Sequence, residues 1–151
     1  MFQQKPEDRL RSWREFRSDI SSLPLEQALA QTLELWAGAP FVPFNLDITD
    51  RDSWPDPWTL INENKYCDIA KCLGIVYTIT LSKHRTDLDV EFRVYVDPET
   101  GYEYNLAWIN QGKYILNMVD REIVNNKQFD KTLKLKHQYT AVDLKLDYYN
   151  N

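Results

Sequence analysis

The sequence predicts an α+β fold in which N-terminal helices pack on an antiparallel sheet of five or six strands. Three observations support this fold class. Apolar residues three and four positions apart indicate helices in the first 38 residues. After Gly74 the apolar residues recur at every second position, as they do in strands. Short segments rich in Asp, Asn and Gly separate several of these alternating stretches, which indicates antiparallel neighbours.

The first helix is predicted over residues 6–21 and the second over residues 24–38. Pro6 suits the first turn of one helix and Pro24 that of the other, while Gly38 suits the end of the second. We interpret their apolar stripes as core packing, with a partner-binding groove as the alternative. The stripes consist of Leu10, Trp13, Phe16 and Ile20, and of Leu25, Ala28, Leu29, Leu33 and Trp36.

A long loop is predicted over residues 39–58, where aromatic side chains stand beside four prolines. These aromatics either pack back on the domain or form a surface that meets another protein. The candidate interaction residues are Phe41, Phe44, Trp54 and Trp58, together with Trp13. The loop also carries Asp47, Asp50, Asp52 and Asp56, but their spacing is not that of a calcium-binding loop, so a solvated acidic loop is expected and no metal site.

A short helix is expected to begin near Cys67 and to end at Gly74. Beyond it, strands are predicted over residues 75–82, 88–96, 102–109, 113–119 and, in an alternating stretch, 131–149. The whole chain of 151 residues is then a single domain. It divides into a helical arm or hairpin (1–38), the aromatic loop (39–58), and the short helix with the sheet (59–151).

Composition excludes several classes of function. A net charge of −5 and an isoelectric point near 5.0 argue against binding to nucleic acids or anionic membranes. No apolar stretch reaches the ~20 residues of a membrane span, and the first residues lack the apolar region of a signal peptide. No phosphate-binding glycine loop or cluster of metal ligands stands out, so no cofactor is expected.

Cys67 and Cys72 are the chain's two cysteines, and their spacing fits neither a zinc motif nor a redox pair. We interpret both as free thiols. A cysteine at a helix N-terminus can be a nucleophile, because the helix dipole favours the thiolate. Such a cysteine would need a histidine base nearby.

The stretch KYCDIAKCLGI (65–75) and the stretch NLAWINQGKYILNM (105–118) together resemble the transglutaminase-like branch of the papain-like cysteine fold. The resemblance implies that Cys67 stands where the family has its nucleophile. Leu106 then stands at the position of the family's histidine, and Asn117 or Met118 at that of its aspartate. Leucine cannot accept a proton, so the resemblance implies a degenerate triad with Cys67, Leu106 and Asn117 as vestigial site residues.

The chain's two histidines, His84 and His137, lie outside the stretches that resemble the family. A cysteine hydrolase or acyl transferase that uses Cys67 with one of them is therefore the alternative function. We expect instead that Cys67 is buried and unreactive between the short helix and the strand with Leu106 and Trp108, beneath Trp54 and Trp58. An apolar ligand pocket beside those three tryptophans is a further alternative.

The opening RLRSWREFR, the proline-started second helix and the PW ahead of YC are similar to small structural proteins of tailed bacteriophages. This resemblance implies a non-enzymatic component of a virion, located in its tail, baseplate or neck and assembled in the host cytoplasm. Its partners would be other protein subunits of the particle; the acidic composition argues against a nucleic-acid partner, and no membrane partner is expected.

Overall fold

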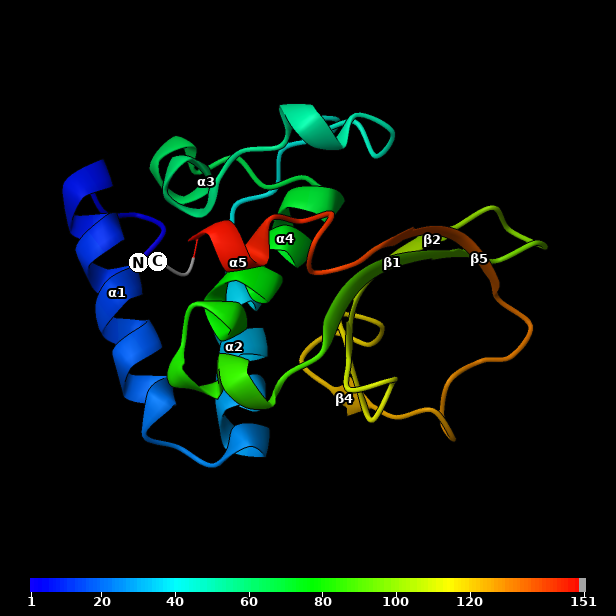
Figure 1. Ribbon diagram of the computed structural model, residues 1–151. Coiled ribbons are helices and arrows are strands. Elements are labelled where there is room, and N and C mark those ends of the chain that lie inside the picture. Colours follow the sequence, from blue (N-terminus) through cyan, green and yellow to red (C-terminus); the bar gives the residue numbers. More distant parts are fainter. Residues whose placement is uncertain (150–151) are drawn as a thin grey trace.

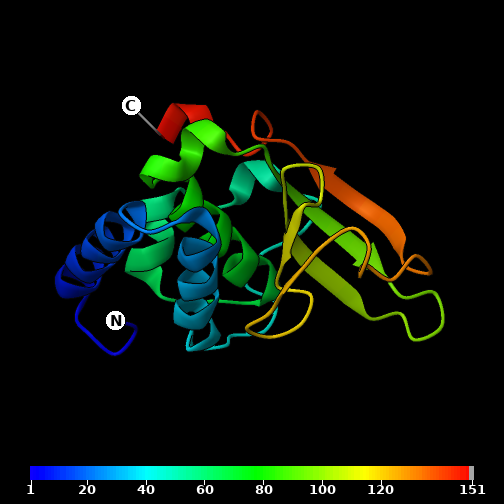
Figure 2. The same ribbon diagram turned by 90° about the horizontal axis from the view of Figure 1, so that it is seen from below.

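The computed structural model describes residues 1–149, and these form a layer of helices against one face of an antiparallel sheet (Figure 1). Seen from below, the two layers remain separate (Figure 2). The predicted α+β class is therefore confirmed. The helices are α1 (Pro6–Ser21), α2 (Leu25–Ala37), α3 (Pro57–Glu63), α4 (Asp68–Thr80) and α5 (Leu146–Tyr149), with short 3-10 helices η1 (Arg51–Ser53) and η2 (Lys83–Asp87). The strands are β1 (Val90–Val96), β2 (Glu103–Ile109), β3 (Tyr114–Leu116), β4 (Ile123–Val124) and β5 (Lys134–Tyr139).

The two N-terminal helices lie where the sequence predicts them. Trp13 and Ile20 of α1 are fully buried, as are Leu29 and Trp36 of α2. The buried guanidinium of Arg9 donates to the carbonyl oxygens of Gln4, Ile61 and Asn62, which ties α1 to the end of α3. The stripes thus serve the core, as interpreted from their spacing.

For residues 67–82 the predicted helix start is confirmed, but the predicted helix end is wrong. A helix does begin after Cys67, but α4 continues through Gly74 to Thr80, so the predicted strand at 75–82 is wrong. Every residue from Cys72 to Thr80 is buried, because α4 lies between the sheet and the other helices. A helix buried on all sides loses its apolar period, and its β-branched residues then resemble a buried strand.

Gly74 is needed inside this helix. A Cβ atom built there would lie 2.3 Å from the ring of Trp36, which is fully buried. The indole nitrogens of Trp13 and Trp36 both donate to Thr78 Oγ1, each at 3.0 Å. One threonine of α4 therefore fixes both N-terminal helices.

The sheet has the order β4-β3-β2-β1-β5, with antiparallel pairing throughout. The predicted strands at 88–96, 102–109 and 113–119 are confirmed as consecutive neighbours with shorter bounds. The alternating stretch at 131–149 is a strand only over β5, and the chain then turns into α5. The predicted loop at 39–58 ends sooner than expected, because α3 starts at Pro57 and Asp56 caps it.

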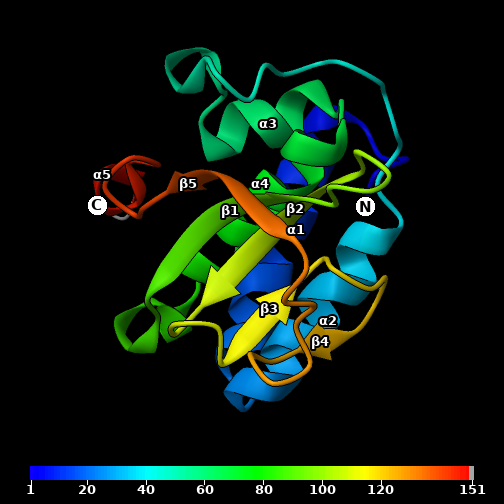
Figure 3. The same cartoon turned by 90° about the vertical axis from the view of Figure 1, so that its right-hand side faces the viewer.

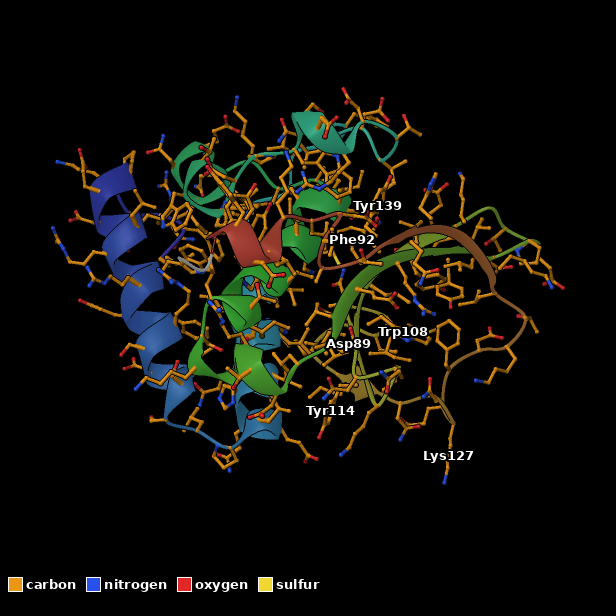
Figure 4. The ribbon with its side chains drawn as sticks, in the orientation of Figure 1. Asp89, Phe92, Trp108, Tyr114, Lys127 and Tyr139 are labelled. Atoms are coloured by element: carbon orange, nitrogen blue, oxygen red, sulfur yellow. The ribbon has the colours of Figure 1, made fainter. Side chains whose placement is uncertain are left out.

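The two faces of the sheet bury different clusters. Ala107 and Ile109 of β2 pack with α4 in the main core, whereas Leu106 and Trp108 point to the opposite face. Figure 4 shows Trp108 on the side of the sheet away from the helices. The chain after β3 covers that outer face with Phe129 and Leu133 (Figure 3).

A candidate binding site at the N-terminus of α4

Cys67 is the residue that precedes the first turn of α4, and its side chain makes no capping hydrogen bond there. It is buried, with 5% of its surface exposed, and it lines a cavity of about 780 Å³. The rest of the wall comes from the segment 41–48, from the first turn of α4 at Asp68 and Ile69, and from the segment 101–105 at the start of β2. The expectation that Cys67 starts a helix and is buried is confirmed.

The cavity has an apolar floor and an aromatic rim. Leu46, Ile48 and Ile69 line it and pack against the main core. At its mouth stand Phe41, Phe44 and Tyr102, whose side chains are 65%, 98% and 61% exposed. Exposed aromatic rings grouped around one hollow are typical of surfaces that contact another molecule.

Phe44 has an unusual backbone as well as an exposed ring. Its φ angle is 56°, in the left-handed region that non-glycine residues adopt at a cost of ~1–2 kcal/mol. The ring gains almost no burial within the chain in return. A strained residue with an exposed aromatic side chain motivates the hypothesis that the ring is used in binding.

The polar groups at the cavity differ in whether they already have partners. Glu103 is paired with Lys136, and the carboxylate of Asp47 accepts from the backbone and hydroxyl of Thr49, which lowers its pKa. Asn105 is only 8% exposed, and its side-chain amide has no hydrogen-bond partner among residues 1–149. This amide is therefore able to donate to or accept from a bound group.

Leu106 does not lie where the resemblance places it. It faces the outer cluster with Trp108, so the expectation that Cys67 packs against these two residues is wrong. Side chains alternate between the faces of a strand, and a shift of one residue exchanges them. The residues of β2 that line the cavity with Cys67 are Glu103 and Asn105, which alternate with Ala107 on the helix side.

Asn117 lies close to this site without entering the same cavity. Its φ angle is 75°, and its Nδ2 donates to the backbone oxygen of Asn105 at 2.9 Å. A smaller hollow of about 240 Å³ is lined by Asn117, Asn105 and Asp68. The structure thus brings Cys67, Asn105 and Asn117 into one region.

Neither histidine lines the cavity with Cys67. His84 belongs to η2, beyond the opposite end of α4, and its Nε2 lies 2.9 Å from the carbonyl oxygen of Ile20. A helix of 13 residues is about 20 Å long, so His84 is far from Cys67. His137 lies on the edge strand β5, opposite Val94 and stacked near Tyr139.

The candidate interaction residues fall into two groups. Phe41, Phe44 and Trp58 are exposed, but Trp58 is not part of the cavity at Cys67. The prediction that Trp13 and Trp54 contact a partner needs correction, because both are buried in the main core. Trp54 packs against Phe92 and Tyr139 and does not line the cavity at Cys67.

Among residues 1–149 no cluster of three or more histidine, cysteine, aspartate or glutamate side chains is arranged to hold a metal ion. Within the same residues, no helix combines the length and the hydropathy that a bilayer span requires. Comparisons with models of protein families, with curated proteins and with solved structures find no match for this chain. Both resemblances therefore remain predictions.

Proposed function

We propose that the protein is a non-enzymatic assembly component that binds another protein subunit at the cavity beside Cys67. The observation that carries the proposal is the exposed, backbone-strained Phe44 at the mouth of a cavity with an apolar floor. Phe41 and Tyr102 extend the same apolar surface. A partner that covered Phe44 would gain about 1.5–3 kcal/mol from its ring alone.

Asn105 supports binding to a protein segment in particular. A peptide backbone carries both a donor and an acceptor, and the primary amide of Asn105 can pair with both. The amide has no hydrogen-bond partner within residues 1–149, so pairing with a bound segment would add a hydrogen bond without breaking one. The cavity volume of about 780 Å³ accommodates one or two side chains of such a segment.

The resemblance to small phage structural proteins supports a virion as the assembly, with the tail, baseplate or neck as its place. A cysteine hydrolase using Cys67 has less support, since neither histidine lines the cavity. If the protein hydrolyses an ester or amide substrate and the Cys67→Ser variant retains that hydrolysis, Cys67 is not its nucleophile.

Site-specific photo-cross-linking tests the proposal. A photoreactive phenylalanine analogue at position 44 should cross-link to one defined protein of the particle or lysate in which the chain occurs. The same analogue at Tyr148, which is 75% exposed in α5, is the matched control and should give no defined product. Equal products from both positions would contradict the proposal.

The substitution Phe44→Asn separates the effect of the aromatic ring on binding from the effect of the left-handed backbone on stability. Phe44→Asn removes the ring, while asparagine tolerates the left-handed conformation better than phenylalanine. We expect partner binding to weaken about 10- to 100-fold, as the loss of one buried ring implies. The free energy of unfolding should stay equal or rise by about 0.5–1 kcal/mol.

A further inference from the structure

A second cavity, of about 640 Å³, lies beyond the other end of α4. Its wall comes from α1, from Trp58 of α3, from α5 and from the segment 81–86 that follows α4. Figure 1 shows α1 on the side of α4 away from the sheet. This basic cavity is lined by Arg14, Arg17, Lys83 and Arg85, by the hydroxyls of Ser18, Ser21, Ser82 and Thr86, and by Trp58, Leu81 and Tyr149.

The charges in this wall are all of one sign. Its residues include four cations and no carboxylate, although the chain has a net charge of −5. Within residues 1–149 the side chains of Arg14, Arg17 and Lys83 form no ion pair. Like charges at Arg14, Arg17 and Lys83 repel one another, and an anion between them would relieve that repulsion.

Among these cations, Arg17 has the clearest lack of hydrogen-bond and charge partners within residues 1–149. Its Nε is buried without a hydrogen-bond partner, while its Nη1 reaches the carbonyl oxygen of Leu81 only at 3.4 Å. Its guanidinium lies over the ring of Trp13, 4.2 Å from the centroid, and so cannot move freely. Burial and then the charge of Arg14 lower the pKa of Arg17, which indicates that the surroundings disfavour its charge.

Two further features define which anion would fit. Ser21 joins the walls by donating to Arg17 O and accepting from Lys83 N, while Ser18 and Thr86 line the cavity with hydroxyl groups. Trp58, 44% exposed, stands at the cavity with Tyr149 at right angles to it, 6.1 Å between ring centroids. Guanidinium and hydroxyl donors suit phosphate oxygens, and an accessible indole suits a flat aromatic base.

We propose that the basic cavity binds a nucleoside phosphate, with its phosphate held by Arg14, Arg17 and Lys83 and its base against Trp58. The volume of about 640 Å³ lies within the range of small-ligand sites. A single confined cavity on an acidic protein favours a mononucleotide over a nucleic-acid strand, which needs a continuous basic track. This site is separate from the proposed partner-binding cavity, because the two share no lining residue.

Calorimetric titration of the full chain tests the proposal with four probes: inorganic phosphate, a nucleoside monophosphate, the matching nucleoside and a short oligothymidylate. The monophosphate should bind most tightly, phosphate more weakly and the nucleoside least. In a parallel NMR titration, the Arg17 Nε–H resonance should shift on addition of the monophosphate. No heat and no shift with either phosphate probe would overturn the proposal.

Variants locate the site. Arg14→Gln and Lys83→Gln should each weaken binding of the monophosphate about tenfold, as loss of a charge-assisted contact implies. Trp58→Leu should weaken the monophosphate but leave inorganic phosphate unchanged. Arg11→Gln is the matched control, because Arg11 lies on the same helix but is paired with Asp8.

Two results would overturn the assignment in different ways. An equal loss on Arg11→Gln would mean that only the general charge of α1 matters. Tighter binding of oligothymidylate than of the monophosphate, with a steep dependence on salt, would identify a nucleic-acid surface instead. Neither result would bear on the partner-binding cavity, which the photo-cross-linking tests independently.

Discussion

At its N-terminal end α4 meets a cavity lined by three carboxylates and no cation, whereas the cavity beyond its C-terminal end is lined by four cations and no carboxylate. The segregation follows the helix dipole, which favours negative charge at the first turn and positive charge at the last. The acids come from Asp47, Asp68 and Glu103, and the bases from α1 and η2. Elements distant in sequence thus place matching charges at each end.

The two cavities also differ in the kind of group that lacks a partner within the part of the chain that the structure describes. At the N-terminal end it is apolar surface, since Phe41, Phe44 and Tyr102 are exposed. At the C-terminal end it is charge, since Arg14, Arg17 and Lys83 form no ion pair within residues 1–149. The difference implies two classes of ligand, one apolar and one anionic, at opposite ends of a buried helix.

The largest expected effect comes from Thr78, which holds both N-terminal helices to α4. Thr78→Val would leave the indole N–H groups of Trp13 and Trp36 buried without an acceptor. We expect the free energy of unfolding to fall by about 3–5 kcal/mol in urea denaturation, because each buried unsatisfied donor costs about 1–3 kcal/mol. Since Arg17 lies over Trp13, phosphate binding should weaken as well.

Thr32→Val is the matched control for that substitution. Thr32 is equally buried in α2, but its hydroxyl only donates to Ala28 O and accepts no indole. Its replacement should change stability by less than about 1 kcal/mol. Equal effects of the two substitutions would show that the shared acceptor does not stabilise the helix layer.

The close packing of α2 on α4 gives the next largest effect. Gly74→Ala should destabilise the protein by about 2–3 kcal/mol, because the new methyl group overlaps the buried ring of Trp36. The better helix propensity of alanine, about 1 kcal/mol, offsets only part of this. In the control Gly38→Ala, the nearest atom is 3.6 Å away and no overlap arises. A Gly74→Ala variant as stable as the control would contradict the packing of the helix layer.

The buried Cys72 in the middle of α4 predicts that the free energy of unfolding depends on pH. Burial raises the pKa of the Cys72 thiol, so the folded chain keeps its proton where the unfolded chain, with a pKa near ~8.5, loses it. The unfolded state then binds fewer protons, and stability falls as pH rises above ~8.5, by about 1.4 kcal/mol at pH ~9.5. Burial shifts the pKa of Tyr66 and of Tyr77 in the same direction, which steepens the loss above pH ~10.

Urea denaturation at a series of pH values measures this loss. The decline between pH ~8.5 and pH ~9.5 should disappear in Cys72→Ala, whatever that variant's absolute stability, because no thiol then titrates at that position. It should persist in Cys67→Ala, which retains Cys72. A decline that is unchanged in Cys72→Ala would assign it to other groups.

Much of the fold could be predicted from periodicity, and the failures have physical causes. The amphipathic helices at 6–21 and 24–38 and the half-buried strand β1 keep a clear period because each has a more solvent-exposed side. The continuation of α4 past Gly74 could not be predicted from periodicity, because its residues are buried on all sides. The small helices α3 and α5 are too short to show a period.

The site was predictable in part. The cysteine at a helix start is visible in the sequence, and so was the aromatic loop at Phe41 and Phe44. Leu106 was placed on the wrong face, although its alternation with Asn105 and Ala107 could have shown which residues share the helix side. The basic cavity could not have been found, since Arg17 and Lys83 meet only through tertiary packing.

The smallest expected effect concerns Cys67, which lies at the acidic and apolar end of α4. Cys67→Ala should lower the free energy of unfolding by only about 1 kcal/mol, because the thiol makes no capping bond and borders a cavity. Iodoacetamide should label Cys67 slowly in the folded protein, because it is 5% exposed, and Cys72, at 0%, only after unfolding. Mass spectrometry of Cys67→Ala and Cys72→Ala assigns each rate to its residue. Rapid labelling of Cys67 near neutral pH would instead reveal a reactive thiolate at the helix end, and the hydrolase would then become the better account of the cavity.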